Sequence, residues 1–368
     1  MVAPHRPPDV NWDVTYACPL RCAHCYSESG RRASRQLETA QLLRVADALV
    51  SLRVPTVQLS GGEPLLVKGL FQVAERLSQA GIEVSLYTSG WRLEPEMIPE
   101  MFRLFSHIHI SVDGTTAAVH DALRGRAGSF QRAMRALTLL DEAARRERER
   151  GGKSIIFGTD CAVVRSNFSQ LESFCSVLAP RFPELKFLFF GAAIPSGLGS
   201  RQGFAEHELL TDEQLRQLGS PAFSEQLLSL CPEGVQVRTV DGFDLQLSPE
   251  RFESGRASSY LMQVEPDGQV RGMPIYEGTV GNLLTEPAQE VWERAFARPN
   301  DPFVVQALAG AKTMQDWARA ARLIDLHFGS EEVRARIARR PEYPSPLRPP
   351  ITRLEPAQRW ETSTRVEG

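Results

Sequence analysis

Six short β-type runs, most of them followed by a longer run with helical periodicity, constrain the fold of this chain more than any other feature. The β-type runs occupy residues 11–16, 56–60, 83–87, 107–112, 155–164 and 186–191. Helical runs lie between them at residues 38–52, 68–79, 94–105, 129–148 and 168–178. This repetition favours parallel strands with right-handed crossovers. We therefore predict an α/β fold, a barrel or a doubly wound sheet, with ligands at the turns that follow the strands.

The pattern changes after about residue 230. Two alternating pairs follow, 235–240 with 243–247 and 260–264 with 269–271, and Pro266-Asp267-Gly268 forms the turn of the second pair. Further helices are expected near residues 287–297, 313–327 and 330–340. We accordingly predict a first domain at 1–230, a small β appendage at 231–300, C-terminal helices at 301–340 and a flexible tail at 341–368.

Charge and hydropathy exclude several classes of partner. The 368 residues include 42 Lys and Arg against 45 Asp and Glu, a net charge of −3, so no polybasic nucleic-acid surface is expected. No apolar run approaches the roughly 20 residues that span a bilayer. The N-terminal sequence MVAPHRPPDV lacks the apolar core of a secretory signal. We predict a cytoplasmic protein that binds neither membrane nor nucleic acid.

Three of the six cysteines are clustered directly after the first β-type run. Cys18, Cys22 and Cys25 have the spacing C-x3-C-x2-C. In a chain without an export signal, such a cluster indicates metal or redox chemistry rather than disulfides. An iron–sulfur cubane held by three thiolates keeps one iron open for another ligand. The alternative is zinc, with His24 or a distant histidine such as His107 or His109 as the fourth ligand.

Polar motifs follow the next three β-type runs. The second ends in Ser60-Gly61-Gly62-Glu63, in which the glycines admit a ligand close to the main chain and the oxygens suit an ammonium group. The third is followed by Thr88 and Ser89, and the fourth by Ser111 and Asp113. Arg124 could bind a carboxylate with two parallel hydrogen bonds. Helix caps, a plain turn and a surface ion pair are the simpler alternatives.

The ordered motifs CPLRCAHCY, LSGGEP, YTSG and ISVDG resemble the radical S-adenosylmethionine (radical SAM) superfamily over roughly residues 10–200. The resemblance implies a partial (β/α)6 TIM-type barrel with one [4Fe-4S] cluster on the three cysteines. It also implies that one-electron cleavage of S-adenosylmethionine gives a 5′-deoxyadenosyl radical that removes a substrate hydrogen. The cofactor contacts that it implies are Ser60 to Glu63 for the ammonium group, Ser111 and Arg124 for the carboxylate or ribose, and His24, Tyr26, Pro195 and Gly197 near adenine, with Thr88, Ser89 and Asp113 at the same mouth.

Residues 255–292 look like the SPASM or twitch extension of this superfamily. Pro266-Asp267-Gly268, Pro274, Gly281-Asn282 and Trp292 match its pattern, but Met273 stands at the hairpin cysteine, Glu253 or Ser254 stands near the earlier one, and no cysteine follows Cys231. Thioether and hydroxyl groups are poor iron ligands, so we predict no auxiliary cluster. Cys231, near the end of the barrel, is a candidate hydrogen-atom donor or simply a buried thiol.

Maturation of a ribosomal peptide natural product is the function that the resemblance favours. Only 17 residues precede Cys18, so a separate leader-peptide-binding protein is expected, besides an electron donor such as flavodoxin or ferredoxin. The enzyme alternative is chemistry on a small molecule, such as a sugar, nucleoside or amino acid, in antibiotic or cofactor biosynthesis. The non-enzyme alternative is a zinc or iron–sulfur regulatory protein.

Overall fold

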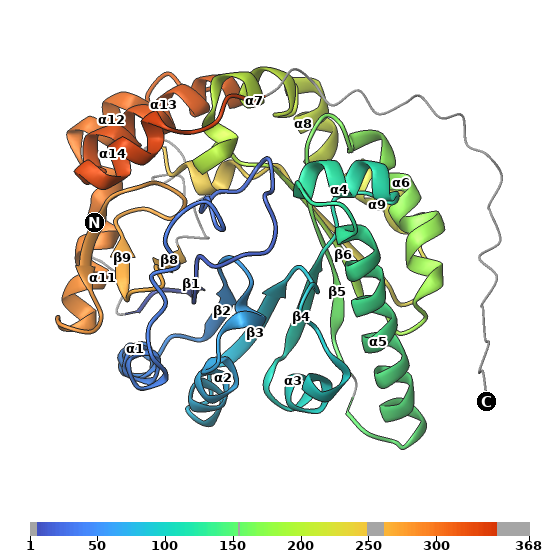
Figure 1. Cartoon of the computed structure of the whole chain (residues 1–368). Coiled ribbons are helices and arrows are strands. Elements are labelled where there is room, and N and C mark those ends of the chain that lie inside the picture. Colours follow the sequence, from blue (N-terminus) through green and yellow to red (C-terminus); the bar gives the residue numbers. More distant parts are fainter. Residues whose placement is uncertain (1–5, 154, 249–260, 344–368) are drawn as a thin grey trace.

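The computed structural model describes residues 6–153, 155–248 and 261–343. Seven parallel strands stand side by side in chain order, and they form the wall of a partial barrel (Figure 1). They are β1 (Asp9–Asp13), β2 (Thr56–Ser60), β3 (Glu83–Thr88), β4 (His107–Ser111), β5 (Phe157–Val163), β6 (Phe187–Ala192) and β7 (Gln236–Val240). The predicted α/β class and the parallel order of the first six strands are confirmed.

Helices cover the outer side of this wall (Figure 1). They are α1 (Thr39–Ser51), α2 (Leu70–Gln79), α3 (Ile98–Leu104), α4 (Ala117–Arg124), α5 (Ser129–Glu149) and α6 (Leu171–Ser173). The chain then forms the short α7 (Gln202–His207), α8 (Asp212–Leu218) and α9 (Pro221–Ser229), and α7 lies beside the C-terminal helices at the top of Figure 1. The single helix predicted at 168–178 is instead divided into a 3-10 turn, α6 and a π turn. None of the described helices combines the length and the apolar character needed to cross a membrane.

The appendage continues the same sheet at its other edge. β8 (Leu261–Val264) runs parallel to β1, and β9 (Gln269–Arg271) and β10 (Thr279–Asn282) follow it antiparallel. The chain then forms α11 (Ala288–Ala297), α12 (Pro302–Leu308), α13 (Met314–Phe328) and α14 (Glu331–Ala338). The predicted pairing of 269–271 with the strand before it is confirmed. The domain limits at 230, 300 and 340 stay predictions, while Glu253, Ser254 and the tail from 344 onward lie outside the described residues.

The predicted pairing of 235–240 with 243–247 is wrong. β7 instead pairs in parallel with β6, and Phe243–Gln246 forms a 3-10 turn. Gly242 has a φ of +77°, and the Asp241 side chain accepts a hydrogen bond from the Phe243 N–H. This local turn ends the strand without reversing it into a hairpin.

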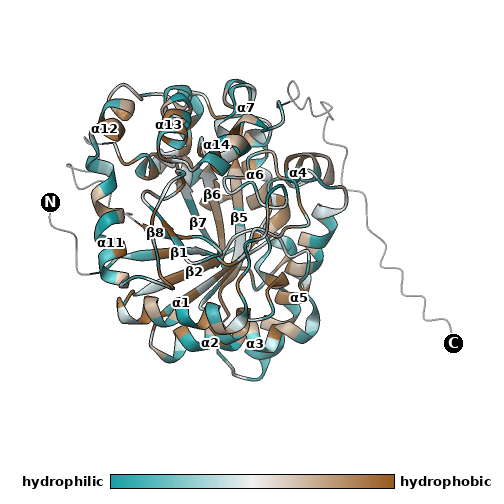
Figure 2. Cartoon of the chain, turned by 60° about the vertical axis from the view of Figure 1, so that its left-hand side comes forward, coloured by the Kyte–Doolittle hydropathy of each residue, from teal (hydrophilic) through white to brown (hydrophobic). Residues whose placement is uncertain are grey.

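The two faces of the parallel sheet differ in polarity. Outward residues such as Val10, Val57, Leu86 and Ile108 are buried beneath the helices, whose outer sides carry more of the hydrophilic residues (Figure 2). Inward residues are mostly polar and half-buried, and they include Asn11, Gln58, Ser85, Tyr87, His109 and Asp160. A TIM barrel usually fills its interior with branched apolar side chains. The inner side of this barrel, here called the lumen, is instead largely polar, and it is hollowed beside His109, Phe189 and Arg238.

Candidate functional site

The cysteine loop, residues 14–34, follows β1 and lies over the carboxyl ends of the strands. Backbone hydrogen bonds hold it in place: the Arg21 N–H donates to the Arg124 carbonyl at the end of α4, and the Ala23 N–H to the Leu123 carbonyl. On its other side, the Leu198 N–H donates to the Cys25 carbonyl at 3.0 Å. The loop is therefore held by two separate segments that follow later strands.

All three clustered thiols line one cavity of about 240 Å³ at this end of the barrel. Burial raises the pKa of the Cys18 thiol to about 12 and that of Cys22 to about 11. A cation is therefore needed to keep these thiols ionised, and metal loading would release their protons. Of the other predicted residues, the cavity is lined by His24, Tyr26, Ser60, Gly61, Gly62, Thr88, Ser89, Ser111 and Arg124.

Gly61 and Gly62, which both line the cavity, also have a local role that was not predicted. A Cβ on Gly61 would lie 2.5 Å from the Thr15 carbonyl oxygen, and one on Gly62 would lie 2.2 Å from that of Ala17. The Gly62 N–H donates to the Thr15 carbonyl at 2.7 Å. The space that the missing side chains leave is thus occupied by the backbone of the cysteine loop, which the glycines allow to pack against the end of β2.

Glu63 is fully buried beneath this contact. Its carboxylate accepts hydrogen bonds from the Thr88 hydroxyl at 2.6 Å, from the Ser89 N–H at 3.1 Å, from the Ser89 hydroxyl and from the Leu65 N–H. Burial nevertheless raises its pKa above the usual range. Glu63 joins the ends of β2 and β3, and its binding of an ammonium group stays a prediction.

Asp113 is the centre of a second buried group. Arg124 contacts both of its carboxylate oxygens, at 2.9 Å and 2.6 Å, and His24 Nε2 lies 2.8 Å from it. Burial alone would raise the pKa of Asp113, but the charges of Arg124 and His24 hold it below its ordinary value. Arg124 thus has a protein carboxylate as its partner. With His24, it is fixed in the cavity wall through Asp113, which lies behind that wall.

Tyr26 connects the cavity to the appendage. Its hydroxyl donates to the buried Asp13 carboxylate at 2.5 Å, and the Gln263 amide of β8 donates to the other oxygen at 3.3 Å. Burial raises the pKa of Asp13 to about 6. The Gln263 oxygen in turn accepts from the Ile275 N–H at 2.7 Å. One wall of the cavity is therefore positioned by residues about 250 positions later in the chain.

Besides Glu63 and Asp113, three further predicted residues lie away from the cavity surface. Gly197 has a φ of +52°, and a Cβ there would lie 2.2 Å from the Tyr26 carbonyl oxygen. Gly197 supports the cysteine loop from the far side, and Pro195 is buried. Cys231 follows α9 and forms a thiol–thiol hydrogen bond with Cys175. The structure therefore does not bring Cys231 to the clustered cysteines, where a hydrogen-atom donor would be needed.

The zinc alternative is not favoured by the placement of the histidines. His24 is turned to Asp113, and His109 is stacked on Tyr87 with ring centroids 4.0 Å apart. His107 lies 3.2 Å from Glu83. Within the described ranges, no three His, Cys, Asp or Glu side chains are grouped closely enough to hold a single metal ion.

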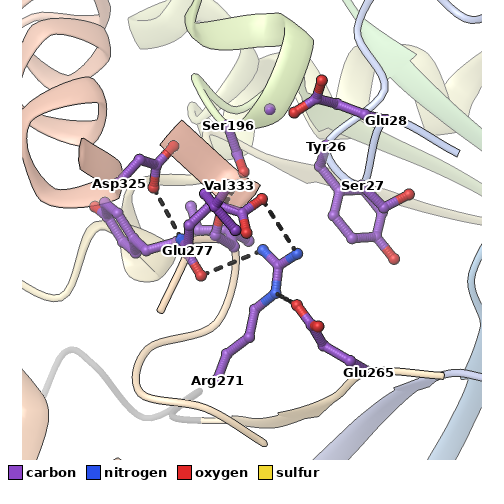
Figure 3. A network of polar contacts seen from close by, with 12 residues as sticks. Tyr26, Ser27, Glu28, Ser196, Glu265, Arg271, Glu277, Asp325 and Val333 are labelled. Carbon is purple, nitrogen blue, oxygen red and sulfur yellow. Dashed lines mark hydrogen bonds and ion pairs between the residues drawn. The ribbon is translucent and has the colours of Figure 1, made fainter. Parts of the chain in front are cut away.

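A buried ionic network next to Tyr26 was not predicted from the sequence (Figure 3). Arg271 is fully buried and contacts Glu265 at 3.0 Å and Glu277 at 3.6 Å. Glu277 also contacts Arg336 of α14 at 2.6 Å, and its N–H donates to Asp325 of α13 at 2.8 Å. Arg336 and Arg340 reach Glu28 of the cysteine loop. The network joins the appendage, the C-terminal helices and the loop.

Sequence reasoning also missed several residues in the cavity wall itself. Tyr87, Asp160 and Ala162 line the cavity from β3 and β5, and Ser27 and Ser29 line it from the loop. Tyr87, Asp160 and Ala162 occupy inward positions near the carboxyl ends of their strands. The period of two along each strand could have identified them.

The donor set suits an iron–sulfur cluster and S-adenosylmethionine. Three thiols without a fourth protein ligand fit a cluster with one open iron, and Arg124, His24 and Ser111 offer polar groups beside them. Cys18, Cys22 and Cys25 would hold the cluster. The remaining lining residues would surround the sulfonium compound.

Comparison with known proteins agrees with this site. The model of the radical SAM superfamily matches residues 12–159. "Mycofactocin maturase MftC" of Mycolicibacterium smegmatis is 33% identical over 298 residues, with 78% of this chain and 70% of that protein covered. "Fe-coproporphyrin III synthase" of Methanosarcina barkeri is 31% identical over 310 residues, with 77% and 73% covered.

Solved structures show the same fold. The crystal structure of Streptococcus suis SuiB bound to S-adenosylmethionine superimposes with a TM-score of 0.60 at 13% identity, covering 93% of this chain and 77% of that chain. The family match, the MftC relative and the shared fold all agree with the site that the three thiols form. The chain belongs to the radical SAM superfamily, and it is an enzyme of that family.

Proposed function

We propose that this enzyme matures a ribosomally made peptide by abstracting hydrogen from an unactivated carbon. The observation that carries the proposal is the match to a mycofactocin maturase over 78% of the chain. That match is 298 residues long, more than the 230 residues assigned to the barrel, so it reaches into the appendage. The fold shared with SuiB, whose structure was also solved with its precursor peptide SuiA, supports the same substrate class.

The bound cluster and S-adenosylmethionine supply a one-electron cleavage that generates a hydrogen-abstracting radical. The protein's part is to position and to shield. Arg124 and His24, fixed by Asp113, hold one wall of the cavity, and Tyr26, fixed by Asp13, holds another. The substrate would reach the cavity through the lumen, where inward groups of the strands offer hydrogen bonds to a peptide backbone.

We infer a single cluster per chain. No cysteine follows Cys231 in the sequence, and Met273 is buried in the appendage beside the Arg271 network. Iron analysis after anaerobic reconstitution should give four atoms per chain, and eight or more would contradict this inference. A one-electron donor such as flavodoxin or ferredoxin and a separate leader-peptide-binding protein would complete the system.

The test is incubation of the reconstituted enzyme with precursor peptides encoded beside its gene. We expect a mass change in the peptide together with formation of 5′-deoxyadenosine, and we expect neither with Cys22→Ala. Circular dichroism of Cys22→Ala checks that the fold is retained. Turnover of small molecules with every peptide left inert would refute the peptide assignment.

A second candidate is chemistry on a small molecule. It is favoured by the 31% identity to Fe-coproporphyrin III synthase over 77% of this chain. The same incubation distinguishes the two candidates when it includes porphyrins, nucleosides and amino acids. The class of compound that stimulates 5′-deoxyadenosine formation identifies the substrate.

A further inference from the structure

Four arginines surround the outer side of the cysteine loop. They are Arg21, Arg31, Arg126 and Arg201, here called the arginine collar. Their guanidinium groups donate hydrogen bonds of 2.6–3.0 Å to carbonyl oxygens of residues 18–23, the backbone that carries the first two clustered cysteines. The first three arginines are exposed.

The positive charge of the collar is not neutralised by neighbouring acids. In the part of the chain that the structure describes, no carboxylate oxygen lies within 4.0 Å of a collar guanidinium. Glu28, the acidic residue of the same loop, forms ion pairs with Arg336 and Arg340 instead. A carbonyl oxygen is a neutral acceptor, so each collar arginine keeps its full charge.

Several arginines elsewhere on the surface differ in this respect. Arg76, Arg103 and Arg135 each contact an acidic side chain at 2.6–3.0 Å. Within the collar, burial and the charge of Arg31 lower the pKa of Arg201 to about 10, as expected where like charges are close. A chain with a net charge of −3 thus places unpaired positive charge on one segment.

Trp91 extends the collar with an aromatic surface. Arg126 lies 4.2 Å from its ring centroid, and Arg132 lies over the same ring at 5.6 Å. Arg201, the fourth collar arginine, adds less to the exposed positive charge, because the acidic Glu206 lines the same hollow. The exposed positive charge is therefore centred on Arg21, Arg31 and Arg126.

We propose that the arginine collar docks an acidic one-electron carrier protein. The carrier would give one electron to the cluster that Cys18, Cys22 and Cys25 would hold: an anionic flavin hydroquinone would become the neutral semiquinone without loss of a proton, and the oxidised cluster would be reduced by one electron. The backbone that the collar contacts carries the cluster ligands, so a carrier seated there is close to the iron. Complementary charge speeds such encounters and makes them sensitive to salt.

A substrate is a poorer fit to the same surface. The hollow through which we propose that the substrate enters is lined by residues such as His107, Lys186 and Gln236, near the amino ends of the strands and opposite to the cysteine loop. The collar lies on the outer side of the loop, where electrons but no hydrogen atom need to pass. The proposal rests on the cluster and is independent of the substrate class.

The first test measures binding and does not need turnover. An oxidised acidic flavodoxin is titrated into the reconstituted enzyme by calorimetry at two salt concentrations. Arg31→Gln/Arg126→Gln should raise Kd about tenfold at low salt and flatten the salt dependence. The matched control is Arg6→Gln/Arg44→Gln, which removes the same charge from two exposed arginines that also donate only to carbonyls, at 2.9 Å and 2.7 Å. The control should bind like the wild type.

The second test follows cluster reduction by absorbance. Flavodoxin hydroquinone should reduce the cluster of Arg31→Gln/Arg126→Gln about tenfold more slowly at low salt, whereas photoreduced 5-deazariboflavin, a small uncharged reductant, should act at the wild-type rate. Equal iron content shows that the loop is intact, and Arg31→Lys/Arg126→Lys should restore flavodoxin binding. Unchanged flavodoxin binding, an equal loss in the control, or loss of peptide binding in place of flavodoxin binding would overturn the proposal.

Discussion

Replacement of Gly62 by alanine should separate the cysteine loop from the end of β2. The new Cβ would lie 2.2 Å from the Ala17 carbonyl oxygen and 3.0 Å from Cys18 Cβ, so the loop must move back by about 1 Å to reach ordinary contact distance. The movement strains two hydrogen bonds, Gly62 N–H to Thr15 at 2.7 Å and Glu63 N–H to Ala17 at 2.9 Å. Overpacking costs about 1–3 kcal/mol and a weakened hydrogen bond about 1 kcal/mol. We expect a loss of about 2–4 kcal/mol in the free energy of unfolding.

Urea unfolding of the protein before cluster loading measures this loss, and iron analysis after reconstitution measures the displacement of Cys18. Gly310→Ala is the control, because a Cβ there meets no atom within 4 Å and its φ is not in the left-handed region. The control should be unchanged or stabilised by up to about 1 kcal/mol. If Gly62→Ala matches Gly310→Ala in both stability and iron content, the glycines do not seat the loop.

Three further predictions concern buried charges. Arg271→Met leaves two buried carboxylates with fewer partners and should cost about 3 kcal/mol in urea unfolding; a loss below about 1 kcal/mol would contradict a structural role for the network. Burial raises the pKa of Asp325 from 3.8 to about 7, so the folded state binds the proton more tightly and stability should fall as pH rises from about 4 to about 7; Asp325→Asn should remove part of that slope, and an unchanged slope would count against it. Asp113→Asn weakens the hold on Arg124 and should raise the Kd for S-adenosylmethionine about tenfold, measured by equilibrium dialysis; wild-type affinity would show that Arg124 needs no such support.

The sheet could be predicted where hydropathy alternates over a whole strand. Residues 56–60 alternate and end at two glycines, and β2 has these same limits. The helices α7, α8 and α9 were missed because segments of six to nine residues show too few turns for a clear period. The segment 243–247 alternates like a strand, but the positive φ of Gly242 starts a turn instead.

The site was predictable only in its local part. The spacing of Cys18, Cys22 and Cys25 implied one centre, and the three thiols share a cavity. Asp113 and Arg124 meet because of the way α4 packs back on the strands. No sequence motif indicates this packing. The contact of Gln263 with Asp13 spans 250 positions, and long-range pairs of this kind have no signature in a single sequence.

The polar lumen has a consequence for how this enzyme can change. The cohesion of the domain comes from the outward side of the sheet, where Val57, Leu86 and Ile108 meet the helices. Inward positions such as Gln58, Ser85 and His109 contribute little to that cohesion, because they are half-buried and polar. Substitutions there can reshape the chamber without loosening the scaffold. New substrates can therefore be acquired one side chain at a time, on an unchanged radical-generating frame.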